Sequence, residues 1–93
     1  MKQFYITTPI FYVNDVPHIG HAYTIIICDS IARYLKLNGN DVLFTTGTDE
    51  HGLKVEKAAK SKNISPIDFV NKVSGNFKDL SNLLEIINTD FIR

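Results

Sequence analysis

The stretch Phe11-Tyr12-Val13-Asn14-Asp15-Val16-Pro17-His18-Ile19-Gly20-His21 lies between a short apolar segment and a long helical one. His18 and His21 stand three residues apart, at the point where a strand would pass into a helix. The first N–H groups of a helix have no partner within it, and the helix macrodipole favours an anion there. Gly20 has no Cβ, so a flat ring or a ribose can lie against its backbone. The stretch therefore predicts a phosphate site for a nucleotide triphosphate.

Two strands and a helix are expected around this stretch. Gln3 to Thr8 is rich in aromatic and β-branched residues and is followed by a proline, which is typical of a short strand. From Ile19 to Asn38, apolar residues recur every three or four positions, which predicts a helix. Asp41 to Thr46 is the second strand, and its run Val42-Leu43-Phe44 indicates burial on both faces. Strand, helix and strand make a parallel βαβ unit, so the fold class is α/β.

Two more helices are expected after the second strand. The first runs from about His51 to Lys62, with its lysines on a solvated face. The second begins after Ser65, because a serine N-cap followed by Pro66 and by Asp68 is typical of a helix start. Its apolar residues follow three- and four-residue spacing: Val70, Val73, Phe77, Leu80, Leu84 and Ile87. This seam predicts one packed face. Phe91 and Ile92 resemble the start of another element.

Composition limits the class of protein. In 93 residues, 10 basic and 10 acidic side chains give a formal net charge of zero, so nothing indicates nonspecific binding to nucleic acid. This length allows one domain at most. Cys28 is the only cysteine, which excludes an internal disulfide and fits the reducing cytoplasm. We expect neither a signal peptide nor a membrane span, since polar residues and Pro9 interrupt the apolar N-terminal segment.

A second polar segment, Thr46-Gly47-Thr48-Asp49-Glu50-His51-Gly52, follows the second predicted strand. Ligands of parallel sheets bind beyond the carboxyl ends of the strands. The two polar segments begin at such ends, near Pro9 and Gly47. We therefore expect them to share one site.

His18-Ile19-Gly20-His21 resembles the signature of class I aminoacyl-tRNA synthetases, and the run from Thr7 to His21 is similar to the methionyl-tRNA synthetase family in particular. The segment from Thr46 to Gly52 resembles the next active-site segment of that family. The resemblance covers essentially all 93 residues, whereas complete enzymes of the family are several hundred residues long. It implies that residues 1–93 are the N-terminal part of a catalytic, Rossmann-like nucleotide-binding domain.

The resemblance implies a binding site for ATP, with its Mg²⁺. His18 and His21 would be the catalytic donors to phosphate oxygens, on which negative charge builds in the transition state. Asn14, Gly20 and His51 would complete the ATP-binding set. For Asn14, a role in the turn alone remains equally open.

The resemblance also implies a binding site for methionine. Ile10 and Tyr12 would line the pocket for its side chain, since a thioether suits an apolar and aromatic wall. Asp49 would receive its α-ammonium group in a charge-assisted hydrogen bond. Core packing is the alternative for Ile10 and Tyr12, and an N-cap of the following helix is the alternative for Asp49.

The implied function is that of a methionine-tRNA ligase, which forms methionyl adenylate from methionine and ATP and transfers the amino acid to tRNA(Met). Most tRNA contacts would lie outside these residues. The family's Lys-rich second signature does not occur in the 93 residues, so we expect this chain alone to be inactive. Two rival functions are a small nucleotidyltransferase with the same His-x-Gly-His and a non-catalytic nucleotide-binding or interaction module. Zinc held by His18, His21, His51 and Asp49 is a competing interpretation, but no metal is expected here.

Overall fold

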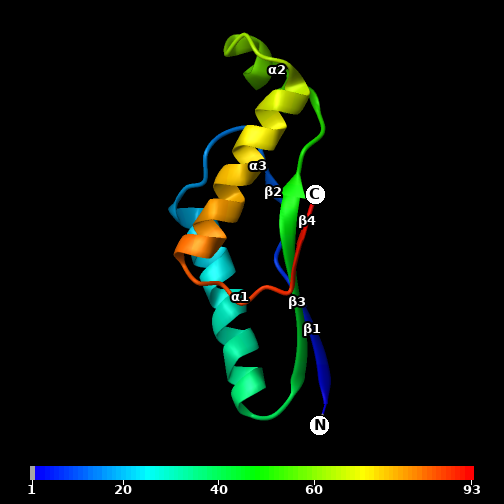
Figure 1. Cartoon of the computed structure of the whole chain (residues 1–93), viewed down its shortest axis with the longest axis vertical. Coiled ribbons are helices and arrows are strands. Elements are labelled where there is room, and N and C mark those ends of the chain that lie inside the picture. Colours follow the sequence, from blue (N-terminus) through cyan, green and yellow to red (C-terminus); the bar gives the residue numbers. More distant parts are fainter. Residues whose placement is uncertain (1) are drawn as a thin grey trace.

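The computed structural model, which describes residues 2–93, has strands on one side and helices on the other (Figure 1). The elements in chain order are β1 (Gln3–Thr7), β2 (Phe11–Tyr12), α1 (Ile19–Leu37), β3 (Asp41–Asp49), α2 (Leu53–Ser61), α3 (Pro66–Leu83) and β4 (Asp90–Ile92). Figure 1 shows α1 and α3 beside the strands and α2 beyond the carboxyl end of β3. The predicted α/β class, with a βαβ unit followed by two helices, is confirmed.

β3 is the central strand, and β1, β2 and β4 all pair with it in parallel. β1 and β4 both pair at Thr45, so they lie on opposite edges of β3. β4 includes Phe91 and Ile92, where the sequence indicated a new element. The two-residue β2 was not predicted, because it is too short to show a periodic pattern.

β3 differs from its prediction in length and in burial. It continues past Thr46 to Asp49, because β2 pairs with its last two residues and β4 with Gly47. The prediction of burial on both faces is wrong for Leu43, which is 45% exposed, although Phe44 is fully buried. Leu43 lies opposite Tyr5 in register, and Tyr5 is exposed too. These two side chains lie on the face that the helices do not cover.

α1 follows the predicted periodicity. Ile25 and Ala32 are buried in the core, whereas Ile26 and Ile27 lie on the exposed side of the helix. The helix ends at Leu37, one residue before the predicted end.

The two later helices begin at well-defined positions. α2 begins at Leu53 rather than at His51. Gly52, which precedes it, has φ 125°, and a residue with this backbone angle cannot be part of a right-handed helix. α3 begins as predicted, with the N–H of Asp68 donating to Oγ of Ser65 at 3.3 Å. The seam is confirmed in part, since the helix ends at Leu83 and its last two apolar residues lie beyond it. Within residues 2–93, no helix has the length and apolar character that crossing a bilayer requires.

Candidate active site

His18 and His21 form a reciprocal cap at the start of α1. The N–H of Gly20 donates to Nδ1 of His18 at 3.0 Å, and the N–H of His18 donates to Nδ1 of His21 at 3.0 Å. His18 is the N-cap residue, with φ −126° and ψ 178°. Two of the N–H groups that a helix start leaves unpaired are thus satisfied by imidazoles of the predicted site.

The cap also determines which ring nitrogens can face a ligand. Because Nδ1 of both His18 and His21 accepts a hydrogen bond, the proton of each neutral ring lies on Nε2. The rings are stacked, with centroids 3.8 Å apart and planes at 27°. Each ring therefore carries its N–H donor on Nε2, a kind of donor that suits an anion.

His21 is the more enclosed of the two histidines. Its ring meets Phe11 and Phe77 edge-on, at centroid distances of 5.2 and 4.9 Å. Burial, and secondarily the charge of His18, lower the pKa of His21 below its ordinary value of 6.5. The neutral form of His21 is thereby favoured near neutral pH.

Gly20 is needed by the cap itself. A Cβ built at Gly20 would lie 2.8 Å from Cε1 and 3.0 Å from Nδ1 of His18. The sequence predicted that a flat ring or a ribose can lie against this backbone, and in the structure the imidazole of His18 lies close to it. Gly20 thus allows the His18 ring to fold back over the first turn.

Tyr12 and Asp49, two of the predicted methionine-binding residues, lie opposite each other at the ends of β2 and β3. The N–H of Val13 donates to the carbonyl of Asp49 at 3.2 Å, which extends the pairing by one bond. The alternative role of Asp49 as an N-cap is wrong, because α2 is preceded by Gly52 with no side-chain cap. Ile10 is 56% exposed, so core packing does not explain it, whereas Tyr12 is partly buried against the core.

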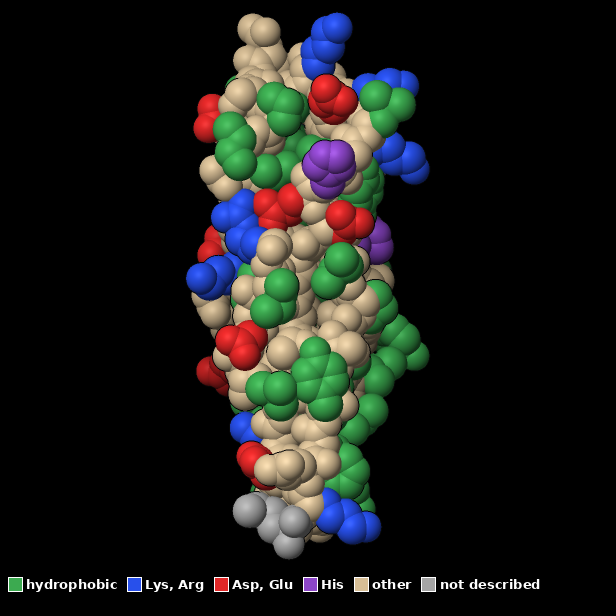
Figure 2. Space-filling model, turned by 90° about the vertical axis from the view of Figure 1, so that its right-hand side faces the viewer, with side chains coloured by type: hydrophobic (Ala, Val, Ile, Leu, Met, Phe, Trp, Pro, Cys, Tyr) green, Lys and Arg blue, Asp and Glu red, His purple; other side chains and the backbone are tan. Residues whose placement is uncertain are grey.

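Asn14 and His51 are exposed and stand in different loops. Asn14 lies in the bend between β2 and α1. His51 lines a cavity of about 320 Å³ with residues of α2 and Pro66, and neither His18 nor His21 lines that cavity. In Figure 2, histidine side chains appear at separate places on the strand side of the molecule. His51 thus lies beside the start of α2.

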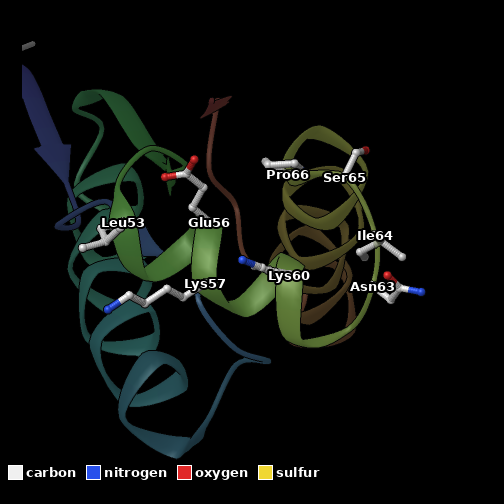
Figure 3. A pocket seen from close by; sticks show the side chains of 8 residues that line it. All are labelled: Leu53, Glu56, Lys57, Lys60, Asn63, Ile64, Ser65 and Pro66. Atoms are coloured by element: carbon white, nitrogen blue, oxygen red, sulfur yellow. The ribbon is translucent and has the colours of Figure 1, made fainter.

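A cavity larger than the one at His51 lies elsewhere. It has a volume of about 650 Å³ and is open to solvent between α2 and the start of α3. Figure 3 shows the residues that line it: Leu53, Glu56, Lys57 and Lys60 come from α2, and Asn63, Ile64, Ser65 and Pro66 come from the segment that leads into α3. None of the predicted site residues lines it. We therefore place the candidate site at the strand ends and the start of α1, and not in this cavity.

One polar network near Asp49 was not found from the sequence. Glu50 pairs with Arg93 through two hydrogen bonds, and the hydroxyl of Thr48 donates to Glu50 at 2.7 Å. The hydrogen bonds from Arg93 are the main cause of the lowered pKa of Glu50. Glu50 therefore neutralises the charge of Arg93. Its partner is 43 residues away, a separation at which no spacing rule applies.

The described residues do not gather a metal site. Across residues 2–93, no three His, Cys, Asp or Glu side chains lie close enough together to hold a metal ion. The four ligands of the zinc interpretation are therefore not assembled in this structure.

Comparisons with known proteins identify the family of this chain. Residues 4–93 match the family model described as tRNA synthetases class I (M). The methionine–tRNA ligases of Rickettsia felis and Listeria monocytogenes are 62% and 52% identical to the chain over 92 residues. Those residues are 99% of this chain but 18% and 14% of the two relatives.

A solved structure has the same fold. The methionyl-tRNA synthetase of Mycobacterium tuberculosis in complex with methionyl-adenylate matches 100% of this chain and 18% of its own, with 45% identity and a TM-score of 0.98. This match confirms the Rossmann-like fold. The family model, the similar ligases and the matching structure lead to one conclusion: this chain belongs to the class I tRNA synthetases (M).

Proposed function

We propose that this chain is the N-terminal part of the catalytic domain of a methionine–tRNA ligase. The observation that carries the proposal is the 45% identity and 0.98 TM-score to a synthetase solved with methionyl-adenylate. Methionyl-adenylate joins methionine to AMP, so the proposed substrates of the first step are methionine and ATP. The proposed second step transfers the amino acid to tRNA(Met).

In the first step, the carboxylate of methionine attacks the α-phosphate of ATP, a new O–P bond forms, and pyrophosphate leaves. Negative charge builds on the phosphate oxygens as the bond forms. His18 and His21 donate to these oxygens from Nε2, because their Nδ1 atoms are occupied by the cap. Preorganised donors of this kind each lower the barrier by on the order of 3 kcal/mol. Asn14, Gly20 and His51 complete the proposed ATP contacts.

Methionine is held at the ends of β2 and β3. Asp49 accepts the α-ammonium group, and its exposed carboxylate beside the paired Tyr12 fits this role. Tyr12 and the exposed Ile10 supply an aromatic and an apolar wall for the thioether chain.

Other parts of the reaction need residues beyond these 93. Mg²⁺ would arrive with the ATP phosphates, and we assign no side chain of this chain to it. The lysines that stabilise pyrophosphate and most contacts to tRNA(Met) would come from the remaining enzyme, so the 93 residues alone should be inactive. The cytoplasm is the proposed location, because a single cysteine fits a reducing compartment.

Exchange of labelled pyrophosphate into ATP tests the proposal in the full-length protein. We expect exchange that requires methionine and is not supported by leucine. A small nucleotidyltransferase would not depend on methionine, and a non-catalytic module would show no exchange at all. Either result would refute the proposed function.

A further inference from the structure

An ion pair joins the residue that follows β3 to the residue that follows β4. Arg93 donates from Nε to Oε2 of Glu50 at 2.8 Å and from Nη2 to Oε1 at 2.6 Å. The side chain of Glu50 keeps 16% of its exposure and that of Arg93 keeps 46%. Two parallel hydrogen bonds between planar groups set their orientation as well as their distance. The pair thus ties together the carboxyl ends of two neighbouring strands.

α3 holds both members of this pair. Nη2 of Arg93 also donates to Oδ1 of Asn71 at 2.6 Å. The hydroxyl of Thr48 donates its only proton to Glu50, so the hydroxyl of Ser74, 3.1 Å away, donates to Thr48. Thr48 and Ser74 are both buried. Glu50 is therefore attached to β4 and α3 and has little freedom to turn.

Asp49 lies between two such attachments. On one side its own carbonyl accepts the N–H of Val13 at 3.2 Å, which holds it to the end of β2. On the other side the next residue, Glu50, is held by Arg93. The carboxylate of Asp49 itself is exposed and is free to meet a ligand. Rotation of the peptide that joins Asp49 to Glu50 would redirect this carboxylate.

We propose that Arg93 is a positioning residue, which acts through Glu50 to orient the carboxylate of Asp49 toward the amino group of methionine. The inference rests on the proposed function, since it needs methionine at Asp49. Arg93 does not touch the substrate in this scheme. Its guanidinium is required because it makes a bidentate hydrogen bond to the Glu50 carboxylate. A lysine would keep the charge but could not make both hydrogen bonds in this planar arrangement.

The chain offers a matched control in Arg33. Its side chain is 48% exposed and pairs with Asp29 at 2.8 Å, and it also donates to the carbonyl of Glu85. Arg33 thus resembles Arg93 in exposure and in ion pairing, but it lies on α1, away from Asp49. Arg33→Lys measures the general cost of losing such a pair.

The test compares Arg93→Lys and Arg33→Lys in the full-length protein, by methionine-dependent pyrophosphate exchange. Since small displacements of positioning groups are costly, we expect Arg93→Lys to raise the KM for methionine on the order of tenfold, with the KM for ATP unchanged. Arg33→Lys should change neither. Equal effects of the two substitutions on methionine would overturn the inference.

Glu50→Gln provides the second arm, because it keeps the size of the side chain and the acceptor for Thr48. The double variant combines Glu50→Gln with Arg93→Lys. If Arg93 acts through Glu50, this variant should lose no more affinity for methionine than Arg93→Lys alone. Additive losses would mean that Arg93 acts by another route and would contradict the proposal.

Hydrogen exchange makes the result independent of activity. In Arg93→Lys, amide exchange should rise in residues 49–52, and in Arg33→Lys it should not. Unchanged exchange in that segment overturns the positioning role. If the wild-type protein shows no methionine-dependent exchange of pyrophosphate into ATP, the proposed function itself is refuted. The two failures are therefore distinguishable.

Discussion

At the scale of single residues, Asp49 is the sharpest test of the methionine site. Asp49→Asn keeps the size of the side chain and removes its charge. We expect methionine affinity in the full-length protein to fall by about 1.5 to 3 kcal/mol, or about tenfold to more than a hundredfold, the range for a hydrogen bond to a charged group. ATP affinity should change little, because the phosphates are proposed to lie at His18 and His21. Separate calorimetric titrations with methionine and ATP measure both.

Asp41 provides the control for this prediction. It is the first residue of the same strand and is exposed as Asp49 is, but it lies at the opposite end. Asp41→Asn should leave methionine binding unchanged. Because the structure excludes Asp49 as a helix cap, unchanged methionine affinity in Asp49→Asn would remove it from the site altogether.

The titration of His21 is a second prediction for a single residue. Its pKa should lie below 6.5 in the ligand-free protein, because burial between Phe11 and Phe77 disfavours the charged ring. Below pH 6.5 the unfolded chain therefore binds a proton at His21 more readily than the folded chain. The stability contributed by the neutral ring is present above that pH and is lost as the pH falls through the lower folded pKa.

NMR of the imidazole ring protons measures this pKa. Phe77→Leu should move it back toward 6.5, since the substitution opens one side of the ring to water. A value at or above 6.5 in the unsubstituted protein would show that burial does not control His21.

At the scale of elements, the pairing of β4 with β3 depends on Gly47. A Cβ built there would lie 2.1 Å from the carbonyl oxygen of Ile92, which is backbone and cannot rotate away. We expect Gly47→Ala to destabilise the protein by about 1 to 3 kcal/mol, the usual cost of overpacking, and to loosen β4. The melting temperature and amide exchange in residues 90–92 of the full-length protein test this.

Gly75 is the matched control for Gly47. It lies inside α3, and an added Cβ meets nothing within 4 Å. Gly75→Ala should raise stability by up to about 1 kcal/mol, because alanine favours a helix more than glycine does. If both substitutions had the same effect, the close approach of β4 would not be the reason for a glycine at position 47.

At the scale of the whole molecule, the chain is elongated and open. Its extents are 51 × 20 × 16 Å and its radius of gyration is 14.9 Å, whereas a compact domain of this length has about 12 Å. Its accessible surface of 6186 Å² also exceeds the roughly 5,400 Å² of a typical protein of this mass. Figure 2 shows hydrophobic side chains exposed along the strand side. Exposed surface of this kind favours association.

We therefore expect the isolated 93 residues to be marginally stable or to self-associate. A four-stranded sheet with helices on one face leaves Tyr5 and Leu43 uncovered and β1 with an open edge. Light scattering should give a mass that rises with concentration, and calorimetry should give a broad melt. A monomeric mass together with a sharp cooperative melt would contradict this prediction.

Local patterns in the sequence determined the α/β class, the parallel βαβ unit and the start of α3. These features depend on periodicity, capping and strand propensity, which act over a few residues. Placing the candidate site at the strand ends also followed from the sequence, since parallel strands bring their carboxyl ends to one edge. Tyr12 and Asp49 were assigned through the resemblance to the family, and their pairing through β2 was not predicted.

Tertiary structure alone decided the features that join distant residues. The extension of β3 to Asp49 depends on pairing with β2 and β4, and the exposure of Leu43 depends on which face the helices cover. The bond between Glu50 and Arg93 links residues 43 positions apart. Such contacts arise from packing between elements. The spacing of hydrophobic residues and the positions of turn residues do not determine which elements pack together. For the same reason, the sequence did not show that the ring of His18 lies close to the backbone of Gly20.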